Sequence, residues 1–150
     1  MKVKRLLLIQ GHPDPSAAHL CHALLLAYAA GARAADHTVR HVTVSELDKG
    51  FLEQVARPGF AFSPDARGNP IGKKALAGRS ARVVVTMGMP ALVYRWYFQA
   101  HSIKSLRRNI LGLCGIAPVR NTLIGRTGNL SATDAAAWIE KLKQLGRRAQ

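Results

Sequence analysis

Residues 10–16 form the first segment whose side chains could bind a ligand. The segment leaves an apolar run and enters a helix-like stretch. Backbone N–H groups, the Ser16 hydroxyl and the His12 ring could therefore hold a phosphate together. It is neither a dinucleotide fingerprint, which requires G-x-G-x-x-G, nor a P-loop, which requires Gly-Lys-Ser/Thr. Taken alone, the residues favour the plainer interpretation, in which Ser16 is only a helix cap and His12 only a loop residue.

Residues 86–101 form the second segment and hold four of the nine aromatic side chains. Gly88 would let a backbone approach a flat ligand closely. Tyr94 and His101 supply a phenol and an imidazole, which can donate protons or stabilise an anion formed by hydride transfer. The alternative is an aromatic cluster that packs a helix on a sheet. For Tyr94 and His101 the residues alone leave both interpretations open.

Metal binding and hydrolysis are not predicted. His19 and His22 lie three residues apart with Cys21 between them. A metal site needs ligands that converge from several elements, and no clear third ligand stands beside them. The eight Asp and Glu residues are scattered, and no Ser-His-Asp order suggests hydrolysis. Core or surface roles are therefore the expectation for both histidines.

Alternating strands and helices must position the two segments. The pattern predicts strands at residues 3–9, 38–44, 81–87 and 118–124, helices at 16–35, 45–56, 103–113 and 132–145, and loops at 59–73 and 88–101. Such alternation implies a parallel sheet with helices on both faces. Ligands bind such sheets at the carboxyl ends of the strands, which is where both segments begin.

Composition limits the class of protein. The 150 residues suit one domain, residues 1–150, and the 48% hydrophobic content excludes a disordered chain. No apolar run approaches the roughly 18 residues that cross a bilayer, and residues 6–9 are too short for a signal-peptide core. We expect a cytoplasmic protein without membrane insertion, in which Cys21 and Cys114 are buried free thiols.

The charge is unevenly distributed. Lys and Arg number 22 against 8 Asp and Glu, a formal net charge of +14. No acidic residue lies between Arg67 and Thr133, whereas basic residues recur throughout that stretch. Such a field attracts a phosphorylated cofactor, nucleic acid or anionic lipid, although a solvated basic surface is an equal alternative. Since no recognised nucleic-acid motif accompanies the charge, no specific nucleic acid is expected.

Several stretches together resemble the flavodoxin-like NAD(P)H:quinone oxidoreductase family. They are residues 6–16, 19–24, 50–55, 58–62, 78–88 and 110–115, and they span nearly the whole chain in order. Among them are LLLIQGHPDPS and GRSARVVVTMG. The resemblance implies an α/β fold with a three-layer α-β-α parallel sheet, bound FMN or FAD, and NAD(P)H as co-substrate. It also implies hydride transfer to a small-molecule quinone, and a homodimer with the active site at its interface.

The resemblance also assigns site residues. Those matching the loop around the flavin phosphate and ribityl chain are His12, Ser16, Ala17 and Ala18. Those matching the loop beside the isoalloxazine are Thr86, Met87 and Gly88. Tyr94 and His101 match the pair beside the nicotinamide and quinone.

The chain departs from that family after residues 46–48. Members normally continue through a helix and the third strand of the sheet, which ends in a loop against the flavin ring. Residues 49–53 here match the helix after that loop, so about one αβ unit is missing, judged against the ~30 residues of a βαβ motif. We expect a four-stranded sheet ordered second, first, third, fourth. Fewer contacts to the flavin predict weak binding or none.

Three functions remain open at this point. The leading one is a flavin-dependent NAD(P)H:quinone oxidoreductase, in which Tyr94 and His101 stabilise the developing anion. The second is a non-catalytic binding or regulatory protein, since some relatives in the resembled family are ancillary subunits of potassium efflux systems. The third is non-specific nucleic-acid binding through the acid-free basic stretch.

Overall fold

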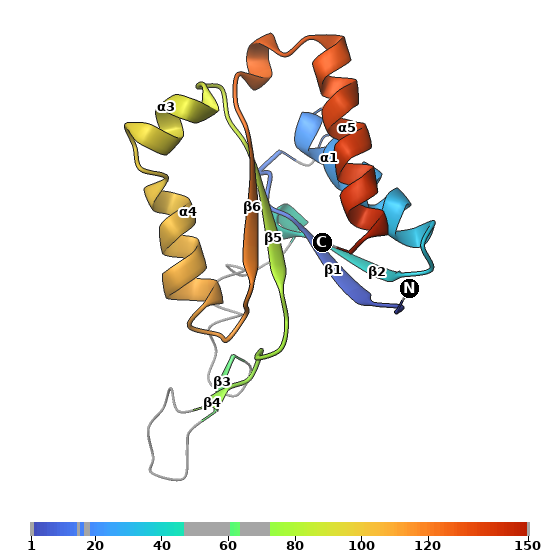
Figure 1. Cartoon of the computed structure of the whole chain (residues 1–150), viewed down its shortest axis with the longest axis vertical. Helices are drawn as coiled ribbons and strands as arrows, with labels where there is room; N and C mark the ends of the chain where they lie inside the picture. The colour runs from blue at the N-terminus through green and yellow to red at the C-terminus, as the bar shows by residue number, and fades with distance from the viewer. Residues whose placement is uncertain (1, 15, 17–18, 47–60, 64–72, 150) are drawn as a thin grey trace. The chain divides into compact units, whose positions relative to one another are not determined.

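The computed structural model describes residues 2–14, 16, 19–46, 61–63 and 73–149 (Figure 1). The chain divides into two compact units. Unit 1 comprises Met1–Asp48 and Thr127–Gln150, and unit 2 comprises Lys49–Arg126. Each unit is described below by itself.

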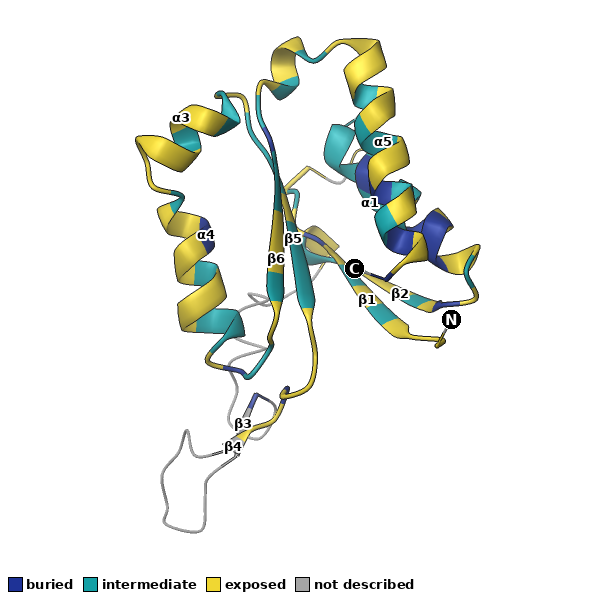
Figure 2. Ribbon diagram, viewed as in Figure 1, coloured by how far each residue is buried: buried dark blue, intermediate teal, exposed yellow. Residues whose placement is uncertain are grey.

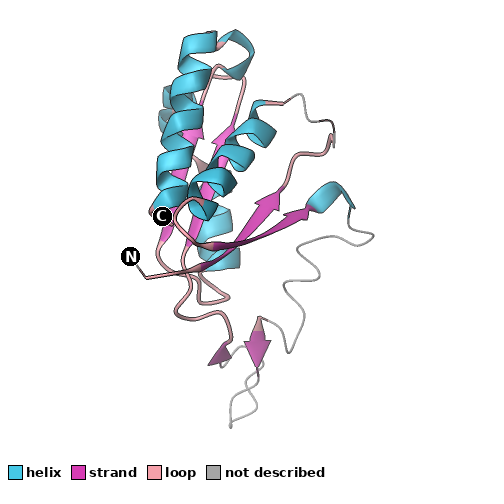
Figure 3. Cartoon of the chain, turned by 90° about the vertical axis from the view of Figure 1, so that its right-hand side faces the viewer, coloured by secondary structure: helices cyan, strands magenta, loops and turns pink. Residues whose placement is uncertain are grey.

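Unit 1 is a parallel strand pair with two helices. Its elements in chain order are β1 (Arg5–Gln10), α1 (Leu20–Arg33), β2 (Thr38–Thr43), η1 (Val44–Glu46), η3 (Thr127–Asn129) and α5 (Ala132–Arg147). Strands β1 and β2 pair in parallel, from Arg5 opposite Thr38 to Gln10 opposite Thr43. Helix α1 is the crossover between them and contacts both strands, and α5 packs on α1 (Figure 3). Gln10, at the carboxyl end of β1, is thus placed where a ligand site is expected.

Two glycines allow α1 and α5 to approach closely. A Cβ on Gly31 of α1 would lie 1.9 Å from the Lys143 carbonyl oxygen, and a Cβ on Gly146 of α5 would lie 2.1 Å from the Tyr28 carbonyl oxygen. Around this contact Ala32 and Leu142 are buried, and Figure 2 colours further buried stretches of this unit dark blue. The helix contact is therefore the centre of the unit 1 core, since buried apolar surface supplies most of the folding free energy.

His37 joins the two ends of unit 1. Its buried ring accepts the Lys4 backbone N–H at Nδ1 (3.3 Å) and bonds the Arg147 carbonyl oxygen through Nε2 (3.2 Å). Because a backbone N–H can only donate, Nδ1 is the acceptor and Nε2 carries the proton. The ring therefore fastens the end of α5 to the start of β1 in its neutral form.

Unit 2 also centres on a parallel strand pair. Its elements are β3 (Phe62–Ser63), β4 (Lys73–Lys74), β5 (Ala81–Thr86), α3 (Ala91–Trp96), α4 (His101–Ser105), η2 (Leu106–Leu111) and β6 (Val119–Ile124). Strands β5 and β6 pair in parallel, from Ala81 opposite Val119 to Thr86 opposite Ile124. The short strands β3 and β4 pair antiparallel. A small cluster of Ala61, Leu76 and Cys114 is buried beside Ile116.

The four predicted main strands are confirmed within one or two residues at each end. Within the units the described strands pair as β1–β2 and β5–β6 in parallel and β3–β4 antiparallel, and the predicted pairing of the first strand with the third, which would join the two units, stays a prediction. Each parallel pair is fixed by its own helical crossover. The predicted pairing of the first strand with the third rested on the alternation of strands and helices and on right-handed crossovers.

Helix boundaries brought two corrections. The first helix begins at Leu20 rather than Ser16, with His19 at its N-cap. Residues 88–101, predicted as a loop, contain the six-residue helix α3. Its aromatic residues are weak helix formers and most of its apolar side chains are exposed, so no helical period was visible in the sequence. The predicted helix 45–56 and most of the loop 59–73 lie outside the described residues.

Cys114 is expected to react with thiol reagents at least about tenfold more slowly than Cys21. Cys114 is 2% exposed, and burial raises the pKa of its thiol because apolar surroundings disfavour the thiolate. Cys21 is only partly buried in α1. Reaction with Ellman's reagent, measured on Cys21→Ser and Cys114→Ser, gives each rate separately. Equal rates in the native protein would contradict the buried position of Cys114.

Candidate functional site

The loop after β1 begins at a buried glutamine. Gln10 is 5% exposed, and its Oε1 accepts the backbone N–H of His12 at 3.3 Å. Its Nε2 is buried and has no hydrogen-bond partner among the residues that the structure describes. A buried donor without a partner costs about 1–3 kcal/mol, so such a group is often completed by a ligand or water.

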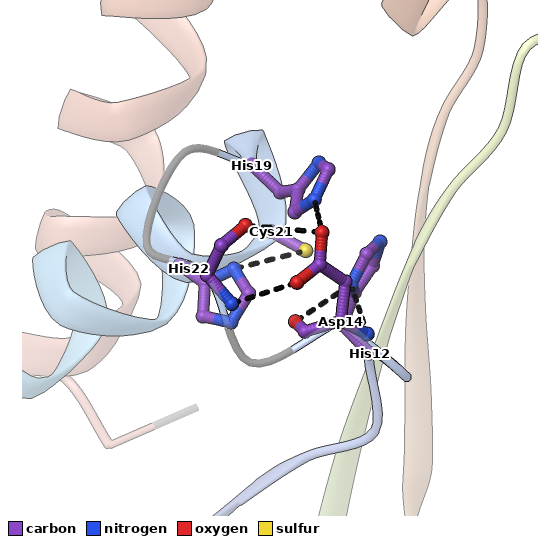
Figure 4. Close-up of polar contacts among 6 residues, drawn as sticks. His12, Asp14, His19, Cys21 and His22 are labelled. Atoms are coloured by element: carbon purple, nitrogen blue, oxygen red, sulfur yellow. Dashed lines mark hydrogen bonds and ion pairs between the residues drawn. The ribbon is translucent and has the colours of Figure 1, made fainter. Parts of the chain in front are cut away.

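Asp14 gathers the hydrogen-bond donors of this loop (Figure 4). Its carboxylate accepts the backbone N–H of Ser16 at 2.9 Å, the Ser16 hydroxyl at 3.0 Å, and His19 Nε2 at 2.8 Å. The hydrogen bond from His19 is the main cause that holds the pKa of this carboxyl far below its ordinary value, and the bonds from Ser16 add to it. The loop is therefore built to surround a negative charge, and Asp14 supplies that charge.

Three imidazole rings lie around this carboxylate (Figure 4). The centroid of His12 lies 4.2 Å from that of His19 and 5.6 Å from that of His22. The backbone N–H of Asp14 donates to His12 Nδ1 at 3.2 Å, which holds the loop in a tight turn. Cys21 Sγ lies 3.8 Å from His22 Nδ1. Within the described part of the chain, no three His, Cys, Asp or Glu side chains are placed to hold a metal ion.

The predicted roles of this segment are partly revised. Ser16 does not cap α1, which begins four residues later without a side-chain cap. Its hydroxyl and N–H instead bond Asp14. His12 and Ser16 thus both contact Asp14, Ser16 at the carboxylate and His12 at the backbone. Ala17 and Ala18 lie outside the described residues.

The second predicted segment follows β5 in unit 2. Thr86 ends β5 opposite Ile124, and the N–H of Met87 bonds the Ile124 carbonyl oxygen at 2.9 Å. Gly88 is exposed, and a Cβ built there would meet nothing within 4 Å. The glycine is therefore not required by the packing of the described residues, which leaves room for a ligand to approach its backbone.

Gly125, directly after β6, holds the loop after β5 in place. A Cβ there would lie 2.3 Å from the Ala91 nitrogen and 2.7 Å from the Met89 carbonyl oxygen. The same carbonyl accepts the N–H of Arg126 at 3.1 Å. Any side chain at position 125 would displace the loop that carries Gly88.

Tyr94 and His101 lie on the two short helices of the same loop. Tyr94 is partly buried in α3, and its hydroxyl forms a short hydrogen bond with Ser102. His101 is exposed at the first position of α4. The N–H of Ala100 bonds the Tyr94 carbonyl oxygen at 3.1 Å, which ties the two helices together. The structure thus joins Tyr94 to Ser102, while the His101 ring faces solvent.

Sequence reasoning missed several of these residues. Gln10 was visible as a polar residue ending an apolar strand, and Asp14 as the only carboxylate within the loop. Gly125 was visible as a glycine directly after a predicted strand. Ser102 carried no sequence signal, because only the turn between α3 and α4 brings it to Tyr94.

The chain belongs to a family with the flavodoxin-like fold, whose sequence profile matches residues 42–148. Its parallel strand pairs and crossover helices are thus parts of a flavodoxin-like α/β fold. No helix among the described residues is both long enough and apolar enough to span a membrane.

Two solved structures share this fold. Smu.1420 from Streptococcus mutans UA159 has a TM-score of 0.76 at 19% identity, covering 97% of this chain and 100% of its own. An NAD(P)H:quinone oxidoreductase from Methanothermobacter marburgensis has a TM-score of 0.66 at 13% identity, covering 99% of this chain and 98% of its own. At these identities the likeness concerns the fold alone. No curated protein matches the chain in sequence.

Proposed function

We propose that this protein is a flavin-dependent NAD(P)H:quinone oxidoreductase. The observation that carries the proposal is the loop after β1, where donors converge on an anionic group and a buried donor, Gln10 Nε2, is left without a described partner. The flavodoxin-like family and a quinone oxidoreductase of the same fold support it. The proposed enzyme acts in the cytoplasm as a homodimer on a small quinone.

The residues of this loop fit a phosphate in the type of their donors, and Gln10 adds a buried one. The N–H and hydroxyl of Ser16 and the ring of His19 already bind a carboxylate, and a phosphate accepts the same donors. Gln10 Nε2 would add a further donor. These residues would hold the phosphate of FMN or FAD. A bound flavin would supply the hydride chemistry, taking hydride from NAD(P)H and passing it to a quinone.

Residues of unit 2 would stabilise the negative charge that develops on the acceptor. The Tyr94 hydroxyl is positioned by Ser102 and can donate a hydrogen bond to an oxyanion of the acceptor. His101 is exposed, and its imidazole can donate a hydrogen bond to the acceptor. Gly88 leaves its backbone open to a flat ring. We further propose that the chain lacks one αβ unit, including the loop that would cover the flavin ring. With fewer contacts to the ring, we expect the flavin to bind less tightly.

Asp14 favours a second candidate, a flavodoxin-like binding or regulatory protein that does not use flavin. Its carboxylate occupies the Ser16 donors and places a negative charge where a phosphate would lie. The Asp14 carboxylate would therefore repel a phosphate bound to the same donors. If no flavin displaces Asp14, the loop is a closed structural turn rather than a cofactor site.

A spectral titration decides between the two candidates. The purified protein is titrated with FMN and then FAD, reduced with NADPH under nitrogen, and mixed with a soluble quinone. Saturable binding, bleaching of the flavin band by NADPH and its return with quinone are the expected results. A folded protein that binds neither flavin would contradict the enzyme.

A variant then tests the role of unit 2. Tyr94→Phe should lower kcat for the quinone half-reaction while leaving the Kd for flavin unchanged, since only the hydroxyl is removed. Tyr97→Phe, on an exposed ring of the same segment, is the matched control.

A further inference from the structure

Helix α3 exposes most of its apolar surface. Leu92 is 69% exposed, Trp96 78% and the adjoining Tyr97 80%, and Val93 and Phe98 are also exposed. Clustered apolar exposure of this kind marks an interaction surface rather than ordinary scatter. Tyr94 and Ala91 are the partly buried side chains of the helix. The exposed side chains of the helix make little contact with the rest of the described chain, so they are available to a partner.

The helix that follows exposes basic side chains. Lys104, Arg107 and Arg108 are exposed on α4 and η2 and lie within five consecutive positions of the chain. The ion pairs among the described residues are His19–Asp14 and Lys143–Glu140, so none neutralises these three. No acidic residue occurs in the sequence between residues 67 and 133.

Both features belong to one crossover. Helices α3 and α4 connect the parallel strands β5 and β6, and such a connection lies on one face of the strand pair. Figure 2 shows the outer sides of both helices as exposed. Exposed aromatic and aliphatic side chains are therefore followed within one crossover by uncompensated positive charge.

We propose that this crossover docks the protein on an anionic lipid surface. Trp and Tyr favour the interface of a bilayer, and Lys and Arg near the surface are attracted to anionic headgroups. Leu92, Trp96 and Tyr97 enter the headgroup boundary, while Arg107 and Arg108 contact lipid phosphates. The binding is peripheral. It can be tested apart from the proposed oxidoreductase function, because none of these five side chains is among those proposed to act on flavin or quinone.

Two other occupants fit the surface less well. A nucleic acid would use the rings and the charges, but Leu92 and Val93 offer no face on which a base can stack. A second copy packed on this face would bring Lys104, Arg107 and Arg108 of both copies together, and like charges disfavour a homodimer contact at this face. An anionic bilayer offers an apolar interior to the aliphatic side chains and phosphate groups to the basic ones.

Tryptophan fluorescence tests the docking directly. The sequence has two tryptophans, so Trp138→Phe leaves Trp96 as the only reporter, and Trp96→Phe leaves Trp138. Vesicles of phosphatidylcholine with phosphatidylglycerol should shift Trp96 emission to the blue and allow quenching by brominated lipid. Pure phosphatidylcholine vesicles should do neither, and Trp138 should not respond to either vesicle.

A matched pair of arginine variants tests the charges. Arg107→Gln with Arg108→Gln should lower the partition coefficient on anionic vesicles about thirtyfold, because each basic residue near the surface contributes about a factor of five. Arg147→Gln with Arg148→Gln, at the exposed end of α5, removes the same charge and should change it little. All four side chains are exposed, so folding is expected to be unaffected and is checked by circular dichroism.

Three results would overturn the proposal. An equal loss in both arginine variants would show attraction by net charge alone. Trp96 emission that is already blue-shifted without vesicles, in a dimer by sedimentation, would show that a second copy covers α3. Quenching of Trp96 by single-stranded RNA with no response to vesicles would assign the surface to nucleic acid.

Discussion

Replacing Gly31 with alanine is expected to lower the free energy of unfolding by about 2 kcal/mol. The new Cβ would lie 1.9 Å from the Lys143 carbonyl oxygen and 2.7 Å from its carbonyl carbon. These are backbone atoms, so no side-chain rotation relieves the clash and α1 must move away from α5. Alanine favours an isolated helix by about 1 kcal/mol over glycine, which offsets only part of the cost.

The measurement is thermal unfolding followed by circular dichroism, where a change of this size lowers Tm by about 4–8 °C. Gly146→Ala should act in the same direction, since its Cβ would meet Tyr28 from the opposite helix. Gly128→Ala is the matched control, because a Cβ there meets nothing within 4 Å. A Gly31→Ala protein as stable as the Gly128→Ala protein would mean that the two helices are not in close contact.

Replacing Asp14 with asparagine is expected to raise the affinity for FMN by about tenfold, if the loop after β1 binds phosphate as proposed. The carboxylate now competes for the N–H and hydroxyl of Ser16 and repels the incoming phosphate. Because its pKa is held far below the ordinary value, the carboxylate keeps its charge throughout the working pH range. Asparagine removes the charge with little change in size.

Titration of protein fluorescence with FMN and with riboflavin measures this effect. Riboflavin lacks the phosphate, so its Kd should be unchanged by Asp14→Asn. Asp36→Asn removes one acidic charge from the turn after α1, a position with φ of 58° that asparagine also tolerates, and should leave both affinities unchanged. If Asp14→Asn instead weakened FMN binding, Asp14 would be ordering the donors of the loop rather than competing with the ligand.

The candidate site was only partly predictable. His12 and Ser16 were predicted because a loop between an apolar strand and a helix is a recurrent phosphate site. Their actual partner, Asp14, was not predicted, since competition between an internal carboxylate and a ligand depends on the turn of the backbone. Likewise Tyr94 was identified by its chemistry, but its bond to Ser102 depends on the turn at residues 99–100, where both φ angles are positive.

The sequence by itself determined the four main strands, a helix between the first two of them, though not its first residue, and the helix that starts at residue 132. Periodicity and turn residues are local, so they can be recognised without the rest of the chain. The tertiary structure decided the rest. It brought Gly31 and Gly146 into helix contacts, paired the strands two by two, left Gln10 Nε2 buried without a described partner and exposed the aromatic side chains of α3. These features depend on contacts between residues far apart in sequence, whose packing no local pattern specifies.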